Sequence, residues 1–149
     1  MKKILSNSPD ETEEIAANLS SELSGGEVIA FRGGLGMGKT CFTRGLAKGL
    51  GFKGAVTSPT FALINEYKGG RLDIYHFDMY RILSWDELYS SGFFEYLECD
   101  GVVVAEWSEN IENALPESTI YVEINAVDDE KREIIIFRKG EEPNESFEY

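Results

Sequence analysis

The first regular pattern of apolar and polar positions along the chain is a helical one. Residues 8–11, Ser-Pro-Asp-Glu, have the form of a capping box with proline at the first helical position. Apolar side chains then recur at a spacing of four residues, at Ile15, Leu19 and Leu23. This spacing predicts an amphipathic helix that ends near the glycine pair at residues 25–26.

The next segments predict strands that alternate with a helix. Residues 27–32, Glu-Val-Ile-Ala-Phe-Arg, are typical of a short buried strand. A glycine-rich loop follows, and a helix is predicted from about residue 39 to residue 50, closed by Gly51. Residues 60–67 and 71–78 predict two strands joined by a tight turn at a pair of glycines.

The second half of the chain contains its most apolar segment. Residues 84–91 predict a short helix capped by Ser84. Residues 102–105, Val-Val-Val-Ala, form a continuous apolar run that ends in a carboxylate, which is typical of a central strand buried on both faces. Residues 118–127 and 131–139 predict a closing antiparallel hairpin.

Composition and charge restrict the function classes. The chain has 149 residues, is 42% hydrophobic and carries a net charge of −13, which argues against a general nucleic-acid coat. No apolar run is long enough to span a membrane, and the N-terminal lysines are not followed by the apolar stretch of a signal peptide. The two cysteines, Cys41 and Cys99, fit no metal spacing. We therefore expect a cytoplasmic protein with reduced thiols.

The positive charge is concentrated in one segment. Residues 32–65 contain no Asp or Glu and carry a local charge of +5, which leaves −18 for the remainder of the chain. The basic residues of this segment are Arg32, Lys39, Arg44, Lys48 and Lys53. Such a segment indicates an anionic ligand bound at one place, although chance clustering of solvated lysines would give the same pattern.

A phosphate-binding motif lies inside the basic segment. Gly33-x4-Gly38-Lys39-Thr40 matches the P-loop pattern, between a predicted strand and a predicted helix. The glycines let consecutive N–H groups surround a phosphate, and the helix N-terminus adds the positive end of its dipole. Lys39 would reach the β- and γ-phosphates, the Thr40 hydroxyl would ligate Mg²⁺, and the N–H of Cys41 would reach the α-phosphate. No Asn-Lys-x-Asp segment for guanine occurs, so ATP is favoured over GTP.

Such a site needs a carboxylate that holds Mg²⁺ or orients a water molecule. Glu106 ends the apolar strand, where the ends of parallel strands meet a ligand, and Asp78 is the second candidate. Each could also be an ordinary solvated acid at a strand end. His76 stands beside aromatic residues and is as readily explained by packing, so we do not assign it to catalysis.

Four segments, in order along the chain, resemble the TsaE family, the small ATPases of bacterial tRNA threonylcarbamoyladenosine synthesis. They are residues 33–51, 56–67, 75–82 and 102–109, with distinctive Ser-Pro-Thr-Phe and His-Phe-Asp-x-Tyr-Arg sequences. The resemblance implies an α/β, three-layer P-loop NTPase fold, in which a central, mostly parallel sheet is flanked by helices and ends in an antiparallel hairpin. The chain length allows one domain, so we expect a single P-loop ATPase domain over residues 1–140, followed by an acidic tail at 141–149.

The resemblance also implies residue roles. Lys39, Asp78 and Glu106 would be catalytic, and Thr40, Asp78 and Glu106 would hold the metal. The expected nucleotide contacts are Thr12, Gly36, Met37, Gly38, Lys39, Thr40, Cys41, Trp107 and Arg132, of which Thr12 and Arg132 would lie on the base side. Trp107 could equally be core packing, and Thr12 and Arg132 could be ordinary surface residues.

Two short segments resemble nucleotide switches. Residues 57–60, Thr-Ser-Pro-Thr, would sense the γ-phosphate, although a proline-containing loop before a strand explains them as well. Residues 78–81 resemble a second switch. One position departs from the family: Gly34 stands where the loop usually has Asp, so any role of that carboxylate is lost here, while phosphate binding by backbone groups should survive.

The function implied by the resemblance is a Mg²⁺-dependent ATPase, weak alone, that couples ATP binding and hydrolysis to turnover of a TsaB–TsaD complex. The basic segment would face tRNA in that assembly. Two alternatives stay open: a small-molecule P-loop kinase, and a nucleotide-gated adaptor in which hydrolysis is not essential.

Overall fold

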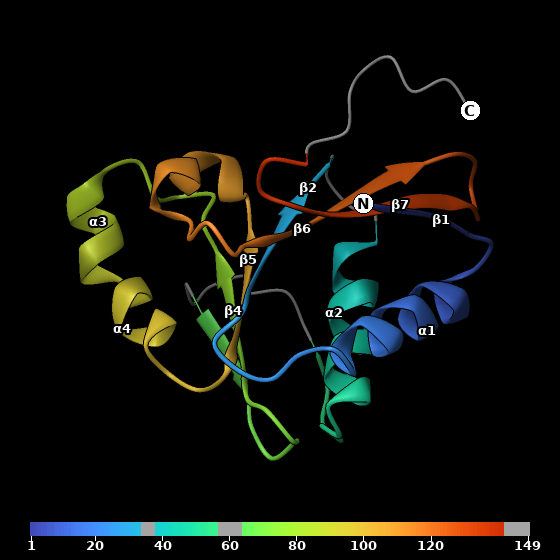
Figure 1. Cartoon of the computed structure of the whole chain (residues 1–149), viewed down its shortest axis with the longest axis horizontal. Coiled ribbons are helices and arrows are strands. Elements are labelled where there is room, and N and C mark those ends of the chain that lie inside the picture. Colours follow the sequence, from blue (N-terminus) through green and yellow to red (C-terminus); the bar gives the residue numbers. More distant parts are fainter. Residues whose placement is uncertain (34–37, 57–63, 142–149) are drawn as a thin grey trace.

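One sheet forms the centre of the molecule (Figure 1). The computed structural model describes residues 1–33, 38–56 and 64–141, and within these ranges seven strands pair in the order β1-β7-β6-β2-β5-β4-β3. The strands are β1 (Lys2–Ser6), β2 (Val28–Arg32), β3 (Ile64–Tyr67), β4 (Ile74–Asp78), β5 (Val102–Glu106), β6 (Ile120–Ala126) and β7 (Arg132–Arg138).

The centre of the sheet is parallel and its margins are antiparallel. Strand β2 pairs in parallel with β5 on one side and β6 on the other, and β4 pairs in parallel with β5. At the margins, β7 runs antiparallel to β6 and β1, and β3 runs antiparallel to β4. The predicted α/β fold, with its mostly parallel centre and C-terminal hairpin, is therefore confirmed.

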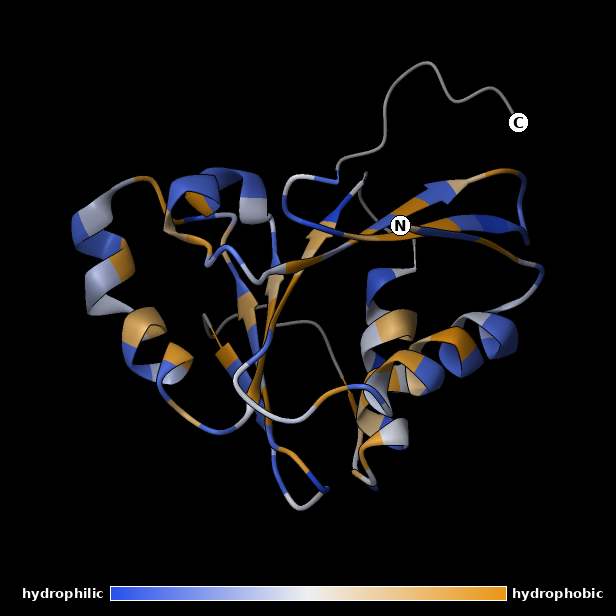
Figure 2. Cartoon of the chain, viewed as in Figure 1, coloured by the Kyte–Doolittle hydropathy of each residue, from blue (hydrophilic) through white to orange (hydrophobic). Residues whose placement is uncertain are grey.

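Helices cover both faces of the sheet. Helices α1 (Pro9–Ser20) and α2 (Lys39–Gly49) lie on one face. Helices α3 (Trp85–Ser90) and α4 (Phe93–Leu97) and the 3₁₀ segment η1 (Ser108–Ala114) lie on the other (Figure 1). Figure 2 shows the hydrophobic colouring concentrated on the central strands between these two helical layers.

The alternation of side chains along β2 supplies both cores. Ile29 and Phe31 pack with α1 and α2, whereas Val28 and Ala30 pack with the helices of the opposite face. All four are at most 1% exposed. Strand β5 is buried in the same way, as expected for parallel strands covered on both faces.

The helix termini agree with the capping signals of the sequence. The Ser8 hydroxyl accepts a hydrogen bond from the Glu11 N–H at 3.1 Å, and the Ser84 hydroxyl accepts one from the Glu87 N–H at 3.2 Å. Gly51 follows α2 with φ +91°, in the left-handed region that favours glycine. These signals are local, so they can be read without knowledge of the fold.

Several boundaries and elements differ from the prediction. Helix α1 ends at Ser20 rather than near residue 25, because the Glu27 carboxylate accepts the N–H groups of Ser24 and Gly25 and holds a turn there. Strand β1, helix α4 and the 3₁₀ segment η1 were not predicted. Residues 57–63 and 142–149, which include the first switch segment and most of the tail, lie outside the described residues.

No helix in the described ranges is long and apolar enough to cross a membrane.

Helices α1 and α2 approach each other closely at Gly45, and we expect Gly45→Ala to lower the free energy of unfolding by about 1–3 kcal/mol. A Cβ at this position would overlap the backbone carbonyl of Glu13 and lie 2.7 Å from the Cβ of Ala16. Urea unfolding measures the change, with exposed Asn18→Ala as a control expected within about 0.5 kcal/mol of wild type. Equal stability of Gly45→Ala and wild type would contradict this close packing.

Candidate nucleotide-binding site

Two carboxylates lie together where adjacent parallel strands end. Asp78 is the last residue of β4 and Glu106 the last of β5, and the two are direct partners in the register of the sheet. Partners in a parallel pair point to the same face, which here is the face covered by α2. The carboxyl edge of the sheet is the usual position of ligands in such folds.

The predicted phosphate loop begins at the same edge and continues into α2. Gly33 has φ +110°, and a Cβ there would lie 2.6 Å from the carbonyl oxygen of Ile124, so the close approach of β6 requires glycine. Gly38 is the N-cap residue of α2, with φ +100°, and no side-chain hydrogen bond caps this end of the helix. The first N–H groups of a helix have no partner within it, which makes this end of α2 suited to an anion. Gly36 and Met37, both predicted contacts, lie outside the described residues.

Lys39 is the cation of this edge. Its side chain is in the first turn of α2, the residue is 7% exposed, and its ammonium lies 5.3 Å from the centroid of the Trp107 ring. Among the ion pairs of the described residues none includes Lys39. A buried ammonium over an aromatic ring, in no ion pair with the described carboxylates, is suited to an anionic ligand.

Trp107 directly follows Glu106 and has an unusual backbone. Its φ of +58° and ψ of +40° lie in the left-handed region, where no other non-glycine residue of the described ranges lies. Such conformations cost about 1–3 kcal/mol and are concentrated at functional sites. The turn carries the Trp107 ring to Lys39 on one side and to Tyr80, at 5.0 Å between ring centroids, on the other.

His76 is the site residue that the sequence analysis left out. It is fully buried on β4, with Nε2 2.8 Å from Oε2 of Glu106 and Nδ1 3.3 Å from the hydroxyl of Tyr67. Because a carboxylate only accepts hydrogen bonds, Nε2–H donates to Glu106; in the neutral imidazole Nδ1 accepts from the hydroxyl of Tyr67. The alternation of side chains along β4 puts residues 76 and 78 on one face, and this could have indicated from the sequence that His76 lies near the site. Its contact with Glu106 depends on the register between β4 and β5, which the sequence does not show.

A cavity of about 410 Å³ adjoins the start of α2. It lies between the first turn of α1, the first turn of α2 and the turn between β6 and β7. Four of the predicted nucleotide contacts line it: Thr12, Gly38, Cys41 and Arg132. The structure thus brings together residues that are far apart in sequence.

The cavity residues are fixed by their own contacts. Thr12 is 3% exposed, so it is not an ordinary surface residue, and its hydroxyl lies 2.7 Å from that of Ser6. The guanidinium of Arg132 donates to the carbonyls of Asp128 and Lys131 at 2.8 and 2.9 Å. Burial raises the pKa of the Cys41 thiol, and the nearby charge of Glu13 raises it further.

The donor set fits magnesium. Thr40, Asp78 and Glu106 offer oxygen ligands, which Mg²⁺ prefers, and the Asp78 carboxylate also accepts the N–H of Tyr80 at 3.0 Å. In the part of the chain that the structure describes, no three His, Cys, Asp or Glu side chains gather as a metal cluster. A magnesium ion here would therefore take its other ligands from phosphates and water, as it commonly does.

The basic residues of the sequence do not converge on one point. Arg32 lies on the opposite face of the sheet, paired with Glu112 at 3.1 Å and placed 4.3 Å from the centroid of the Tyr121 ring. Burial and a hydrogen bond to Glu112 raise the pKa of Tyr121 to about 12. This cluster attaches η1 to the sheet, on the face opposite to Lys39 and the candidate site.

Three further basic residues form a separate surface. Arg44, Lys48 and Lys53 line a cavity of about 470 Å³ that also includes Phe52 and Val56. Lys48 is paired with Glu13 at 3.0 Å. Of these five basic residues, Lys39 therefore lies at the start of α2, whereas Arg32 ends β2 at the same edge but on the opposite face of the sheet.

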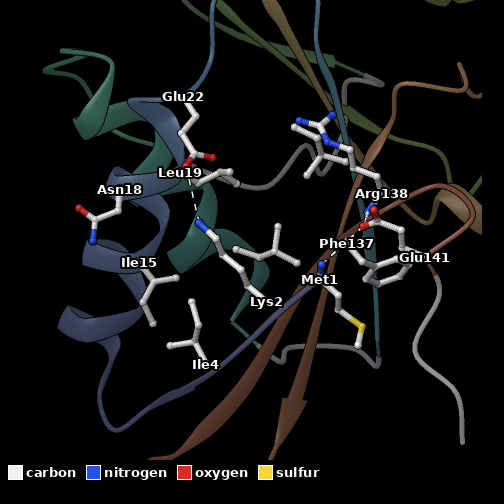
Figure 3. Close-up of a pocket in the computed structure, with 12 residues that line it drawn as sticks. Met1, Lys2, Ile4, Ile15, Asn18, Leu19, Glu22, Phe137, Arg138 and Glu141 are labelled. Atoms are coloured by element: carbon white, nitrogen blue, oxygen red, sulfur yellow. Dashed lines mark hydrogen bonds and ion pairs between the residues drawn. The ribbon is translucent and has the colours of Figure 1, made fainter.

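A further cavity, of about 420 Å³, lies between α1 and the β1–β7 margin (Figure 3). Its floor is aliphatic, with Ile4 and Ile15, and Figure 3 shows two ion pairs among the residues that line it. Lys2 contacts Glu22 at 3.6 Å, and the N-terminal amine contacts Glu141 at 3.5 Å. None of the predicted site residues lines this cavity.

The chain is similar to known proteins over most of its length. The family model "Threonylcarbamoyl adenosine biosynthesis protein TsaE" matches residues 6–134. The tRNA threonylcarbamoyladenosine biosynthesis protein TsaE of Bacillus subtilis (strain 168) is 42% identical over 132 residues, which cover 89% of this chain and 82% of the relative. That of Treponema pallidum (strain Nichols) is 38% identical over 134 residues, which cover 90% of this chain and 98% of the relative.

A solved structure supports the same relationship. The crystal structure of Bacillus subtilis YdiB superimposes with a TM-score of 0.71 at 38% sequence identity, covering 89% of this chain and 82% of that chain. The similarity therefore extends across the strands and helices that carry the site.

We expect Cys41 to react more slowly with iodoacetamide at pH 8 than Cys99. Its raised pKa leaves less thiolate, and it lies half-buried in the cavity, whereas Cys99 is exposed. Saturating MgATP should slow Cys41 severalfold and leave Cys99 unchanged, as measured by mass spectrometry of tryptic peptides. Equal rates at the two thiols, or no effect of nucleotide, would contradict the placement of Cys41 beside the ligand.

Proposed function

The chain belongs to the TsaE family of tRNA threonylcarbamoyladenosine biosynthesis proteins, and from that membership we propose that it is a Mg²⁺-dependent ATPase of this pathway. The observation that carries the proposal is that Lys39, at the start of α2, lies over the ring of Trp107, which directly follows Glu106, while Glu106 and Asp78 are partners at the carboxyl edge of the sheet. The family supplies the pathway, and the arrangement of these three residues supports the chemistry.

Binding would use the α2 N-terminus and the cavity beside it. The backbone at Gly38 and the ammonium of Lys39 would neutralise the phosphates. Thr40, Asp78 and Glu106 would hold Mg²⁺, whose charge would stabilise the phosphate oxygens. Thr12, Cys41 and Arg132 would form the wall against the nucleoside, because they line the cavity next to Gly38.

Hydrolysis would depend on a carboxylate held in one orientation. The Nε2–H of His76 fixes one oxygen of Glu106, and the other oxygen can then orient a water molecule toward the terminal phosphate. His76 is itself held by Tyr67. We assign His76 as a positioning residue and Glu106 as the residue that contacts the reacting water.

The release of phosphate would change the conformation outside the site through Asp78. Its carboxylate accepts the N–H of Tyr80, so a change in its ligands would move the segment 78–81. This is the order of events expected of a nucleotide switch. We propose that a cytoplasmic TsaB–TsaD complex reads this change, and that tRNA in the assembly lies near the surface formed by Arg44, Lys48 and Lys53.

The experiment that tests the function is hydrolysis of γ-labelled ATP by the purified chain, alone and with TsaB–TsaD. We expect weak hydrolysis alone, stimulation by the complex, and a loss of at least about 100-fold in Lys39→Ala, since a charge that stabilises the transition state is removed. Negligible hydrolysis in both settings would contradict the proposal. Label recovered on a small metabolite would indicate a kinase, and repeated turnover by a Glu106→Gln variant without hydrolysis would indicate an adaptor.

A second experiment examines His76. His76→Ala should lower the stimulated kcat about 10- to 100-fold, the usual effect of losing a group that orients a ligand, with little change in the KM for ATP. His76→Gln should recover part of the kcat, because its side-chain amide can donate to Glu106. Thermal unfolding of both variants separates this effect from loss of packing. An unchanged kcat in folded His76→Ala would contradict the assignment of His76 as a positioning residue.

A further inference from the structure

The segment that leads from β4 into α3 exposes much apolar surface. Seven large hydrophobic side chains are exposed in the described ranges, and four of them lie within residues 80–89. They are Tyr80, Leu83, Trp85 and Tyr89, with exposed fractions of 59%, 84%, 52% and 61%. Single exposed apolar residues are ordinary, but a group of this kind marks an interaction surface.

These side chains form a pre-arranged surface with Phe94 of α4. The Trp85 ring is stacked on Phe94 at 6.4 Å between centroids, and the Tyr89 ring lies 4.7 Å from the same side chain. Phe94 contacts buried Phe93, which packs against Phe77 of the sheet. We refer to Tyr80, Leu83, Trp85, Tyr89 and Phe94 as the apolar face. In Figure 1, α3 and α4 lie at the outer side of the molecule, away from α1 and α2.

A small cavity opens beside the apolar face. It has a volume of about 170 Å³ and lies between the start of α3 and η1. Leu83, Leu88 and Ile111 line it together with Glu109 and Glu112. Since one water occupies roughly 30 Å³ in the liquid, the cavity has room for an apolar side chain with several heavy atoms.

The charge around the apolar face is mostly negative, with exposed Arg81, between Tyr80 and Leu83, as the exception. Residues 82–130 contain 13 Asp and Glu residues and no Lys or Arg. Asp86, Glu87, Glu95 and Glu98 are exposed on or beside α3 and α4. A second copy of this chain would bring two acidic rims together, and a nucleic acid would bring phosphates, so both are disfavoured by repulsion.

We propose that the apolar face is the docking surface for a partner protein whose contacting surface is apolar and bordered by lysine and arginine. One apolar side chain of the partner enters the cavity between α3 and η1, and its basic residues meet the acidic rim. Tryptophan and tyrosine are the residues that most often carry the binding energy of such contacts.

The apolar face is connected to the nucleotide site. Tyr80 packs on Trp107, whose ring lies beside the ammonium of Lys39, and the side-chain amide of Asn110 donates to the carbonyls of Met79 and Tyr80. A partner seated on Tyr80 therefore contacts a residue whose N–H is bonded to Asp78. This coupling rests on the proposed function, whereas the docking surface itself is argued from exposure and charge.

The test measures binding of purified TsaB–TsaD by isothermal titration calorimetry. The double variant Trp85→Ala, Tyr89→Ala should weaken the Kd at least about 30-fold, as expected for two such contact residues. Leu5→Ala, which removes an equally exposed side chain from β1, should bind as wild type does. The double variant Asp86→Lys, Glu95→Lys should also weaken binding, and its Kd should depend less on salt concentration than the Kd of the wild type does.

The outcomes separate this inference from the proposed function. Loss of binding in the two double variants but not in Leu5→Ala supports the inference. A lack of stimulated hydrolysis in that case would contradict the proposed function and leave the docking surface in place. Equal affinity of all variants, or no binding by wild type, overturns the assignment of this surface to this occupant. A wild-type dimer that the Trp85→Ala, Tyr89→Ala variant loses in sedimentation assigns the surface to a second copy and also overturns it.

Discussion

Strand β2 is hydrogen-bonded in parallel to β5 and β6, and its first four side chains are buried between two helical layers. The strands of the parallel centre all end at the same edge of the sheet, so the chain leaves β2 at this carboxyl edge, where it enters a helix. That helix is α2, and its first residue is Lys39. The same pairing places the end of β5 at this edge, and β4 follows by its pairing with β5. Residues as distant in sequence as Thr12, Gly38 and Arg132 line one cavity beside this edge.

The parts of this arrangement that the sequence predicted are those with local causes. Ser8 and Ser84 cap helices through bonds to residues three positions away, and the apolar run of β5 needs no partner to be recognised. Strand β1 has no such signal, because five residues with little periodicity become a strand only by pairing with β7, about 130 residues away. The bond between His76 and Glu106 depends in the same way on the register of two strands. The roles of Gly36, Met37 and residues 57–60 stay predictions.

The basic residues and the aromatic contacts lie on different sides of the sheet. The candidate anion site at the start of α2 and the surface of Arg44, Lys48 and Lys53 belong to the α1–α2 side, while α3, α4 and η1 come from residues 82–130, which contain no Lys or Arg. Trp107 lies between them, in contact with Lys39 and with Tyr80. Its strained backbone is explained by this double contact, since a ring on an ordinary strand residue would point to one face only. An anionic ligand and a basic partner protein can thus occupy one small domain without competing.

The most direct test of the account is the affinity for a slowly hydrolysed ATP analogue, measured calorimetrically with and without Mg²⁺. We expect saturable binding that Mg²⁺ strengthens and that Lys39→Ala weakens about ten- to hundredfold, the range expected for a lost hydrogen bond to a charged group. Binding that is absent in wild type, or equal in wild type and Lys39→Ala, would contradict the claim that the carboxyl edge of this sheet is a nucleotide site.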